Sequence, residues 1–185
     1  MERIEFYTYD DEVWCRYEDG RNERLTEKST EIVDLIFDLV MERYSEAFAA
    51  MEVLYGKSKP NLPYYKYVVV RRFIKCNFSK MDGTYIDFDS FAGNNIFNPE
   101  KVECPIRGEC PFEGTICMPI FSSKLTERQS KIAKMLYEGY TKDQIAESLF
   151  LSWETVNCHV SNIYRKLGVH SEAEFVRFVI ANKIF

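Results

Sequence analysis

The C-terminal third of this 185-residue chain constrains the fold most, because helix starts recur there at short intervals. Candidate N-cap residues stand at Thr126, Thr141, Ser152 and Ser171. Gln129 follows Thr126 by three residues, which is the spacing of a capping box. Apolar residues follow each cap at the three- and four-residue spacing of a helix face. The segment therefore predicts four short helices around one small core.

The second and third predicted helices are separated only by a short turn. The third helix has a polar outer face, and its buried face is predicted to be Val156, Val160, Ile163 and Leu167. The small Ala146 lets the second helix approach the third closely. Two helices joined in this way form a helix-turn-helix, which lays its second helix in the major groove of DNA.

The spaced residues of this segment resemble the LuxR/NarL-type DNA-binding domain. The resemblance covers about 60 residues, roughly a third of the chain, and implies a four-helix domain over residues 124–185 that binds double-stranded DNA as a dimer. The matching residues are Leu125, Thr126, Arg128, Gly139, Ile145, Ala146, Leu149, Ser152, Thr155, Val156, His159, Asn162, Ile163, Lys166, Leu167, Gly168 and Val169.

The resemblance also implies which residues contact DNA. Base edges would be met by Asn157, Cys158 and Ser161. The start of the recognition helix, near the DNA backbone, would be formed by Ser152, Thr155 and Val156, and phosphates would be met by Lys142, Arg165 and Lys166. Lys is common in the family at the position of Asn157. Asn lacks that charge but can make a bidentate pair with adenine, so we expect a weaker salt dependence and a different base preference.

The last predicted helix and the residues after it are rich in large apolar side chains. Phe175, Phe178, Ile184 and Phe185 extend beyond its expected inner face. An apolar surface of this kind indicates a partner, and we expect a homodimer.

The N-terminal part, residues 1–121, is expected to be an α+β module. Strands are predicted at 3–9 and 12–18, joined at Asp10-Asp11. A long amphipathic helix should start near Thr30 and end at Gly56, and it could break near Ser45. Residues 64–78 allow strand or helix, and we favour helix. The following stretch holds turn signals and one short alternating run, residues 84–89.

Composition excludes several classes of protein. The net charge is −5, and residues 124–185 hold nine Lys and Arg against seven Asp and Glu, so charge alone does not predict DNA binding. No signal peptide or run long enough to span a membrane is present, and we place the chain in the cytoplasm. The N-terminal part also lacks the acidic strand-end pattern of a phosphoacceptor receiver.

Three cysteines, Cys104, Cys110 and Cys117, stand close together just before the helical segment, and Cys76 lies upstream. Four thiolate ligands are typical of structural zinc sites and of iron–sulfur clusters. We predict a zinc site with these four ligands, with an iron–sulfur cluster as the alternative; redox-active thiols and unrelated packing residues also fit. Cys15 is expected to pack within its strand.

Together these features predict a dimeric, sequence-specific transcription regulator with a metal site beside its DNA-binding domain. No catalytic arrangement is apparent, so an enzyme is not expected. RNA polymerase is a further candidate partner. The rival hypothesis is a protein-interaction module, whose acidic N-terminal part binds polymerase or another regulator and whose helical domain docks on protein.

Overall fold

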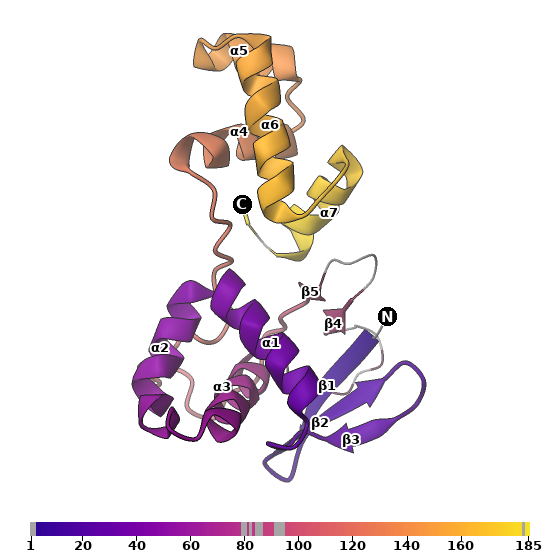
Figure 1. Ribbon diagram of the computed structural model, residues 1–185, viewed down its shortest axis with the longest axis vertical. Coiled ribbons are helices and arrows are strands. Elements are labelled where there is room, and N and C mark those ends of the chain that lie inside the picture. Colours follow the sequence, from indigo (N-terminus) through magenta and orange to yellow (C-terminus); the bar gives the residue numbers. More distant parts are fainter. Residues whose placement is uncertain (1–2, 79–80, 82, 84–86, 91–94, 183) are drawn as a thin grey trace. The chain divides into compact units, whose positions relative to one another are not determined.

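The computed structural model describes residues 3–78, 81, 83, 87–90, 95–182 and 184–185 (Figure 1). The chain divides into two compact units, residues 1–122 and residues 123–185. The first unit is α+β and the second is helical, as the sequence predicts.

The first unit contains an antiparallel sheet whose described strands run in the order β3-β2-β1-β4-β5. Their bounds are β1 Arg3–Tyr9, β2 Glu12–Tyr17, β3 Asn22–Arg24, β4 Phe88–Asp89 and β5 Ile96–Phe97. A phosphoacceptor receiver has a parallel, doubly wound sheet, so this unit has a different fold. Of the alternating run predicted at 84–89, the last two residues form β4, and residues 84–86 lie outside the described part.

The predicted hairpin between β1 and β2 is present. Tyr9 pairs with Glu12, and the two intervening residues, Asp10 and Asp11, have φ values of 50° and 61°. A two-residue turn with both residues left-handed matches the right-handed twist of the strands. Ile4 and Phe6 of β1 point into the core with Val13 and Cys15 of β2, while the residues between them face outward.

The predicted long helix is two helices, α1 (Thr30–Arg43) and α2 (Ser45–Tyr55), followed by a short 3₁₀ turn, η1 (Gly56–Ser58). The break falls at Tyr44, with φ −132° and ψ 58°. Tyr44 is only 2% exposed, and its ring contacts those of Phe73, Phe97 and Phe121. The backbone therefore leaves the helical path where an aromatic side chain enters the core.

The ambiguous segment is helical, as α3 (Leu62–Asn77). Asn61 caps it by accepting a hydrogen bond from the Tyr64 backbone, and proline occupies its first turn. Tyr65, Val69 and Phe73 recur every four residues and are buried. This spacing outweighs the strand preference of the valine run, because it gives the helix a continuous apolar face.

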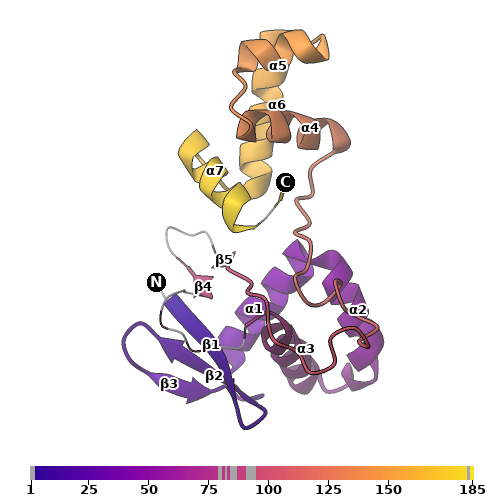
Figure 2. The same ribbon diagram turned by 180° about the vertical axis from the view of Figure 1, so that it is seen from behind.

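The core of the first unit is shared between the sheet and the helices. Phe6 of β1 lies 5.6 Å, ring centre to ring centre, from Phe78, which follows α3 directly. Phe88 of β4 lies 5.2 Å from Phe97 of β5, and Phe97 lies 5.6 Å from Phe73 of α3. Aromatic contacts thus join the two layers, and Figure 2 shows the segment after β5 crossing α3 on its way to the second unit.

The second unit consists of α4 (Glu127–Tyr137), α5 (Lys142–Leu149), α6 (Trp153–Leu167) and α7 (Glu172–Ala181). All four predicted caps are present at Thr126, Thr141, Ser152 and Ser171. Thr126 and Thr141 form complete capping boxes with the glutamines three residues later. Gly168, at φ 68°, ends α6 in the left-handed conformation.

Two of the four apolar side chains expected to lie beyond the inner face of α7 are core residues. Phe175 and Phe178 are buried within the second unit, and the Phe175 ring stacks on Tyr164 at 5.6 Å. These two side chains therefore complete the core of the domain instead of lying beyond it. Of the other two, Ile184 is half-buried and Phe185 is exposed. Ile180, which was not among the four, is 59% exposed.

No helix in the described part of the chain is both long and apolar enough to cross a membrane.

Candidate DNA interface and cysteine pocket

The predicted helix-turn-helix is formed by α5, the turn at residues 150–152, and α6. Ile145 and Ala146 of α5 are buried against α6, whose inner face is Val156, Val160, Ile163 and Leu167. The Arg128 guanidinium donates to the Leu149 carbonyl at 3.0 Å, which satisfies an otherwise open carbonyl at the end of α5.

The outer face of α6 carries most of the residues predicted to contact bases. Cys158 and Ser161 are exposed and Asn157 is partly exposed. The Ser161 hydroxyl donates to the Asn157 carbonyl at 3.0 Å, so that side chain lies close along the helix. Val156 is fully buried, because its position belongs to the inner face of α6. Its side chain therefore packs within the domain, and only its backbone could approach DNA.

Lys142 and Asn157, predicted as separate DNA contacts, are joined. The Lys142 ammonium donates to Asn157 Oδ1 at 2.6 Å and lies 5.6 Å from the centre of the Trp153 ring. The first residue of α5 thus holds the amide on α6 that is predicted to read a base. The amide nitrogen of Asn157 remains a donor, and its oxygen can accept a second hydrogen bond.

The two predicted phosphate contacts late in α6 differ in their surroundings. Arg165 is exposed and donates to Asn162 Oδ1 at 2.8 Å. The Lys166 ammonium donates to Gln129 Oε1 at 2.8 Å and to the Lys124 carbonyl at 2.9 Å. Lys166 therefore fastens the end of α6 to the start of α4, in addition to any contact with a phosphate.

Ser152 and Thr155 form the start of the recognition helix. Two aromatic residues near it, Phe150 and Trp153, were not among the predicted contacts. Ser152 Oγ accepts from the Thr155 backbone N–H at 3.2 Å, and both residues are exposed. Trp153, 44% exposed, and Phe150, 96% exposed, flank Ser152. Their position beside an N-cap is visible in the sequence, but their exposure depends on how the turn is folded.

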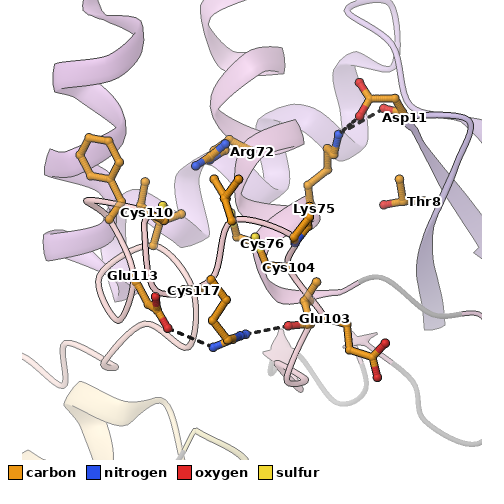
Figure 3. Close-up of a pocket in the computed structure, with 16 residues that line it drawn as sticks. Thr8, Asp11, Arg72, Lys75, Cys76, Glu103, Cys104, Cys110, Glu113 and Cys117 are labelled. Carbon is orange, nitrogen blue, oxygen red and sulfur yellow. Dashed lines mark hydrogen bonds and ion pairs between the residues drawn. The ribbon is translucent and has the colours of Figure 1, made fainter.

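In the first unit, all four predicted metal ligands line one cavity of about 430 Å³ (Figure 3). Cys76 comes from α3, and Cys104, Cys110 and Cys117 come from the loop that follows β5. None of the four forms a disulfide. Within the described ranges, no set of three Cys, His, Asp or Glu residues lies at the spacing of a single-ion site. The four thiols therefore line the same cavity but are not placed to bind one ion together.

Two copies of the same turn carry Cys104 and Cys110, two of the three cysteines of the loop. The Arg107 N–H donates to the Cys104 carbonyl, and the Glu113 N–H donates to the Cys110 carbonyl, each at 3.1 Å. Each cysteine thus opens a four-residue turn with proline second, and a left-handed glycine follows at Gly108 (φ 89°) or Gly114 (φ 76°). This six-residue repeat, CPIRGE-CPFEGT, is visible in the sequence.

One buried amide fastens the loop to α3. Asn77 Nδ2 donates to the Ile116 carbonyl at 2.9 Å, and Asn77 Oδ1 accepts from the Met118 N–H at 2.8 Å. These two bonds hold the backbone on both sides of Cys117, while Asn77 itself directly follows Cys76. The neighbouring positions of Cys76 and Cys117 therefore depend on a single fully buried side chain. The Gly114 N–H also points to Cys117 Sγ, at 3.4 Å.

Charged groups surround the thiols. Burial raises the pKa of Cys76 to about 11. The nearby Arg72 guanidinium lowers this pKa, and the charges of the other three cysteines raise it further. Lys75 and Arg72 line the cavity, and Lys75 pairs with Asp11 of the hairpin turn (Figure 3). The Nε atom of Arg72 is buried and has no hydrogen-bond partner among the described residues.

Comparison with known proteins assigns the second unit. Residues 123–179 match the family described as "Bacterial regulatory proteins, luxR family" (GerE). Relatives named "HTH-type transcriptional regulator MalT", from Yersinia pestis (strain Pestoides F) and Serratia proteamaculans (strain 568), are each 40% identical over 58 residues. That match covers 31% of this chain and 6% of the relatives, so the chain aligns with only a small part of their length.

The matched residues coincide with the four capped helices and include every predicted DNA-contacting residue. The matched description is that of regulatory proteins, not of enzymes. Residues 123–179 therefore form a helix-turn-helix DNA-binding domain of the LuxR family of bacterial transcription regulators.

Proposed function

We propose that this protein is a sequence-specific transcription regulator that reads double-stranded DNA with the outer face of α6. The observation that carries the proposal is the family match over residues 123–179, together with the polar, exposed surface that α6 presents between its caps. A helix of this kind fits the major groove, where each base pair displays a distinct pattern of donors and acceptors.

In this proposal Asn157 contacts a base, with Cys158 and Ser161 beside it on the same face. Lys142 binds a phosphate and orients the Asn157 amide through their 2.6 Å hydrogen bond. Arg165 contributes charge near the DNA backbone, because it is exposed at the end of α6. Ser152 and Thr155 place the positive end of the helix dipole toward a phosphate.

We also propose that the protein binds DNA as a homodimer. A dimer would let two copies of α6 read two half-sites one turn of DNA apart. The exposed Ile180 of α7 and Phe185 near the end of the chain offer apolar surface for a second copy. We also retain RNA polymerase as a candidate partner and the cytoplasm as the location, since bacterial DNA and polymerase are found there.

The four cysteines of the first unit are proposed to hold a metal centre. The support is that Cys76 and the three loop cysteines line one cavity, fixed by Asn77 and by two repeated turns. Zinc and an iron–sulfur cluster both accept four thiolates. Only residues 123–125 separate this unit from the cap of α4, so a metal centre would fix the point from which the DNA-binding domain emerges.

The experiment that tests DNA binding is a fluorescence-anisotropy titration of the full chain against mixed-sequence duplexes over a range of salt concentrations. The proposal predicts that the logarithm of the association constant falls linearly as the logarithm of the salt concentration rises. The slope should be roughly 0.9 per phosphate contacted. No measurable binding at low salt would favour the rival hypothesis, in which the helical domain docks on protein. Lys131→Ala, which removes an exposed charge from α4, is the control for loss of charge alone.

A further inference from the structure

The placement of the four cysteines around their cavity differs from that of a four-cysteine zinc site. In a four-cysteine zinc site each sulfur lies about 2.3 Å from the ion, so the thiolates close around it and leave no space between them. Here all four thiols line one cavity, yet no three Cys, His, Asp or Glu side chains of the described residues are placed to hold one ion. A cluster of several iron and sulfide ions fills more of such a space while binding the same four side chains.

The loop carries features that suit a cluster. The repeated turns present Cys104 and Cys110 at equivalent positions, one repeat apart, and both residues line the same cavity as Cys76. The backbone N–H of Gly114 is directed at Cys117 Sγ. Hydrogen bonds from backbone amides to cluster-bound sulfurs are among the interactions that stabilise iron–sulfur centres and adjust their potentials.

Positively charged side chains around the cavity also complement the negative charge of a thiolate-bound cluster. Four thiolates bound to a cluster carry net negative charge, and a buried negative group needs a compensating partner. Lys75 already pairs with Asp11, and Arg107 donates to Glu113 and to the Val102 carbonyl. Arg72 lies against Cys76 with its Nε buried and unpartnered among the described residues. Among the described residues, its Nε–H is therefore a donor available to the cavity.

We propose that Cys76, Cys104, Cys110 and Cys117 bind an iron–sulfur cluster, with Arg72 beside it as the compensating cation. This inference rests on the metal centre of the proposed function and specifies its occupant. The cluster joins the end of α3 to the repeated turns of the loop. It would therefore hold this loop on α3 in addition to the Asn77 hydrogen bonds and the bond from the Ser122 N–H to the Arg43 carbonyl.

The test is to purify the full chain without oxygen and to measure iron, acid-labile sulfide and zinc per chain, with the visible absorption spectrum. Two or four irons per chain, with an equal number of sulfides and a brown colour, are expected. Cys104→Ser and Cys110→Ser should each reduce iron at least tenfold. Cys15→Ala is the matched control, because Cys15 is buried in the same unit but does not line the cavity, and it should keep the iron.

One zinc per chain in a colourless protein would overturn the cluster and leave the metal centre intact. A wild-type chain without metal would overturn both. Duplex-DNA binding is measured on the same samples, so DNA binding without iron refutes this inference while leaving the DNA-binding proposal standing. Since a serine variant could fail to fold, the metal content of the wild-type chain decides the matter independently.

Arg72 gives a second, independent readout. Arg72→Gln removes a positive charge beside the cluster, which should make its reduction potential more negative, because the less negative oxidised state then becomes relatively more stable. Arg72→Lys should restore most of the shift. An unchanged potential in Arg72→Gln would remove Arg72 from the proposal.

Discussion

At the scale of single residues, two amides carry much of the organisation of their units. Asn77 uses its whole side chain inside the first unit, donating to the Phe73 and Ile116 carbonyls and accepting from the Met118 N–H. Asn157 lies at the surface of the second unit and is held by Lys142. One amide thus positions a loop, and the other is positioned by a neighbour for contact with DNA.

Asn77→Leu keeps the approximate volume of the side chain and removes its polar atoms. The Ile116 carbonyl and the Met118 N–H would lose their buried partner, so we expect the first unit to lose about 2–3 kcal/mol of stability. Urea denaturation of the full chain, followed by near-ultraviolet circular dichroism, measures this loss. Asn61→Ala, which removes an exposed helix cap, should cost about 1 kcal/mol. Equal losses in the two variants would contradict the role given to Asn77.

Lys142→Ala should do more than remove a phosphate contact. Because Lys142 orients Asn157, the variant should weaken binding to all duplexes roughly three- to tenfold and also relax the preference at the base pair that Asn157 reads. Binding measured on a panel of duplexes differing at single positions separates the two effects. Lys131→Ala provides the comparison for charge alone. Uniform weakening, with the base preference unchanged, would show that the hydrogen bond to Asn157 does not act in the complex.

At the scale of elements, the turn of the helix-turn-helix contains a residue in an unfavourable conformation. Phe150 ends α5 with φ 52° and ψ 48°, and its side chain is 96% exposed. The left-handed conformation brings the Cβ of any L-residue too close to the following carbonyl oxygen. The exposed ring provides little packing in return. The domain therefore carries strain at the point where its two DNA-binding helices meet.

Phe150→Gly should stabilise the second unit by about 1 kcal/mol, since glycine adopts this conformation without a steric penalty. Thermal denaturation of the full chain gives the measurement. Phe150→Ala keeps the Cβ and removes the ring, so its stability should stay near that of the wild-type chain. If the alanine variant gained as much as the glycine variant, the exposed ring and not the backbone would be the source of the strain.

Sequence reasoning worked well where structure is set locally. The caps of the last four helices and the hairpin turn are encoded within a few residues and follow from the sequence, whereas residues 64–78 only favour the helix that forms α3. The break at Tyr44 was uncertain, because it depends on a ring that packs against Phe73, Phe97 and Phe121 from distant segments. Strands as short as β4 and β5 have too few residues to show a period.

In the candidate sites, too, locally encoded features could be predicted and those that depend on distant segments could not. Residue type predicted that four cysteines belong together, and they line one cavity, but their spacing in sequence could not give its size. Periodicity placed Val156 on the inner face of α6, while the family resemblance placed it near DNA; its burial favours the inner face. The link between Lys142 and Asn157 requires the distance between two helices, which no sequence pattern contains.

At the scale of the whole molecule, two units with separate cores should respond differently to loss of metal. A group that binds only the folded state adds stability to the unit that holds it. Removing metal with a chelator should therefore lower the melting temperature of the first unit and leave that of the second unchanged. Differential scanning calorimetry of the full chain resolves this, with Cys104→Ser as a control that should not respond to chelator. A chelator effect on both transitions, or on neither, would contradict the metal centre.

The central claim is that α6 reads a DNA sequence, and selection from a random duplex library by the full chain, followed by sequencing of the bound fraction, tests it most directly. If α6 reads a DNA sequence, the wild-type chain will enrich a defined sequence motif from the library. The Asn157→Ala variant should lose preference at one position of each half-site, by roughly 1–3 kcal/mol of discrimination. A bound fraction as random as the starting library, at salt concentrations where duplex DNA binds, would contradict this claim.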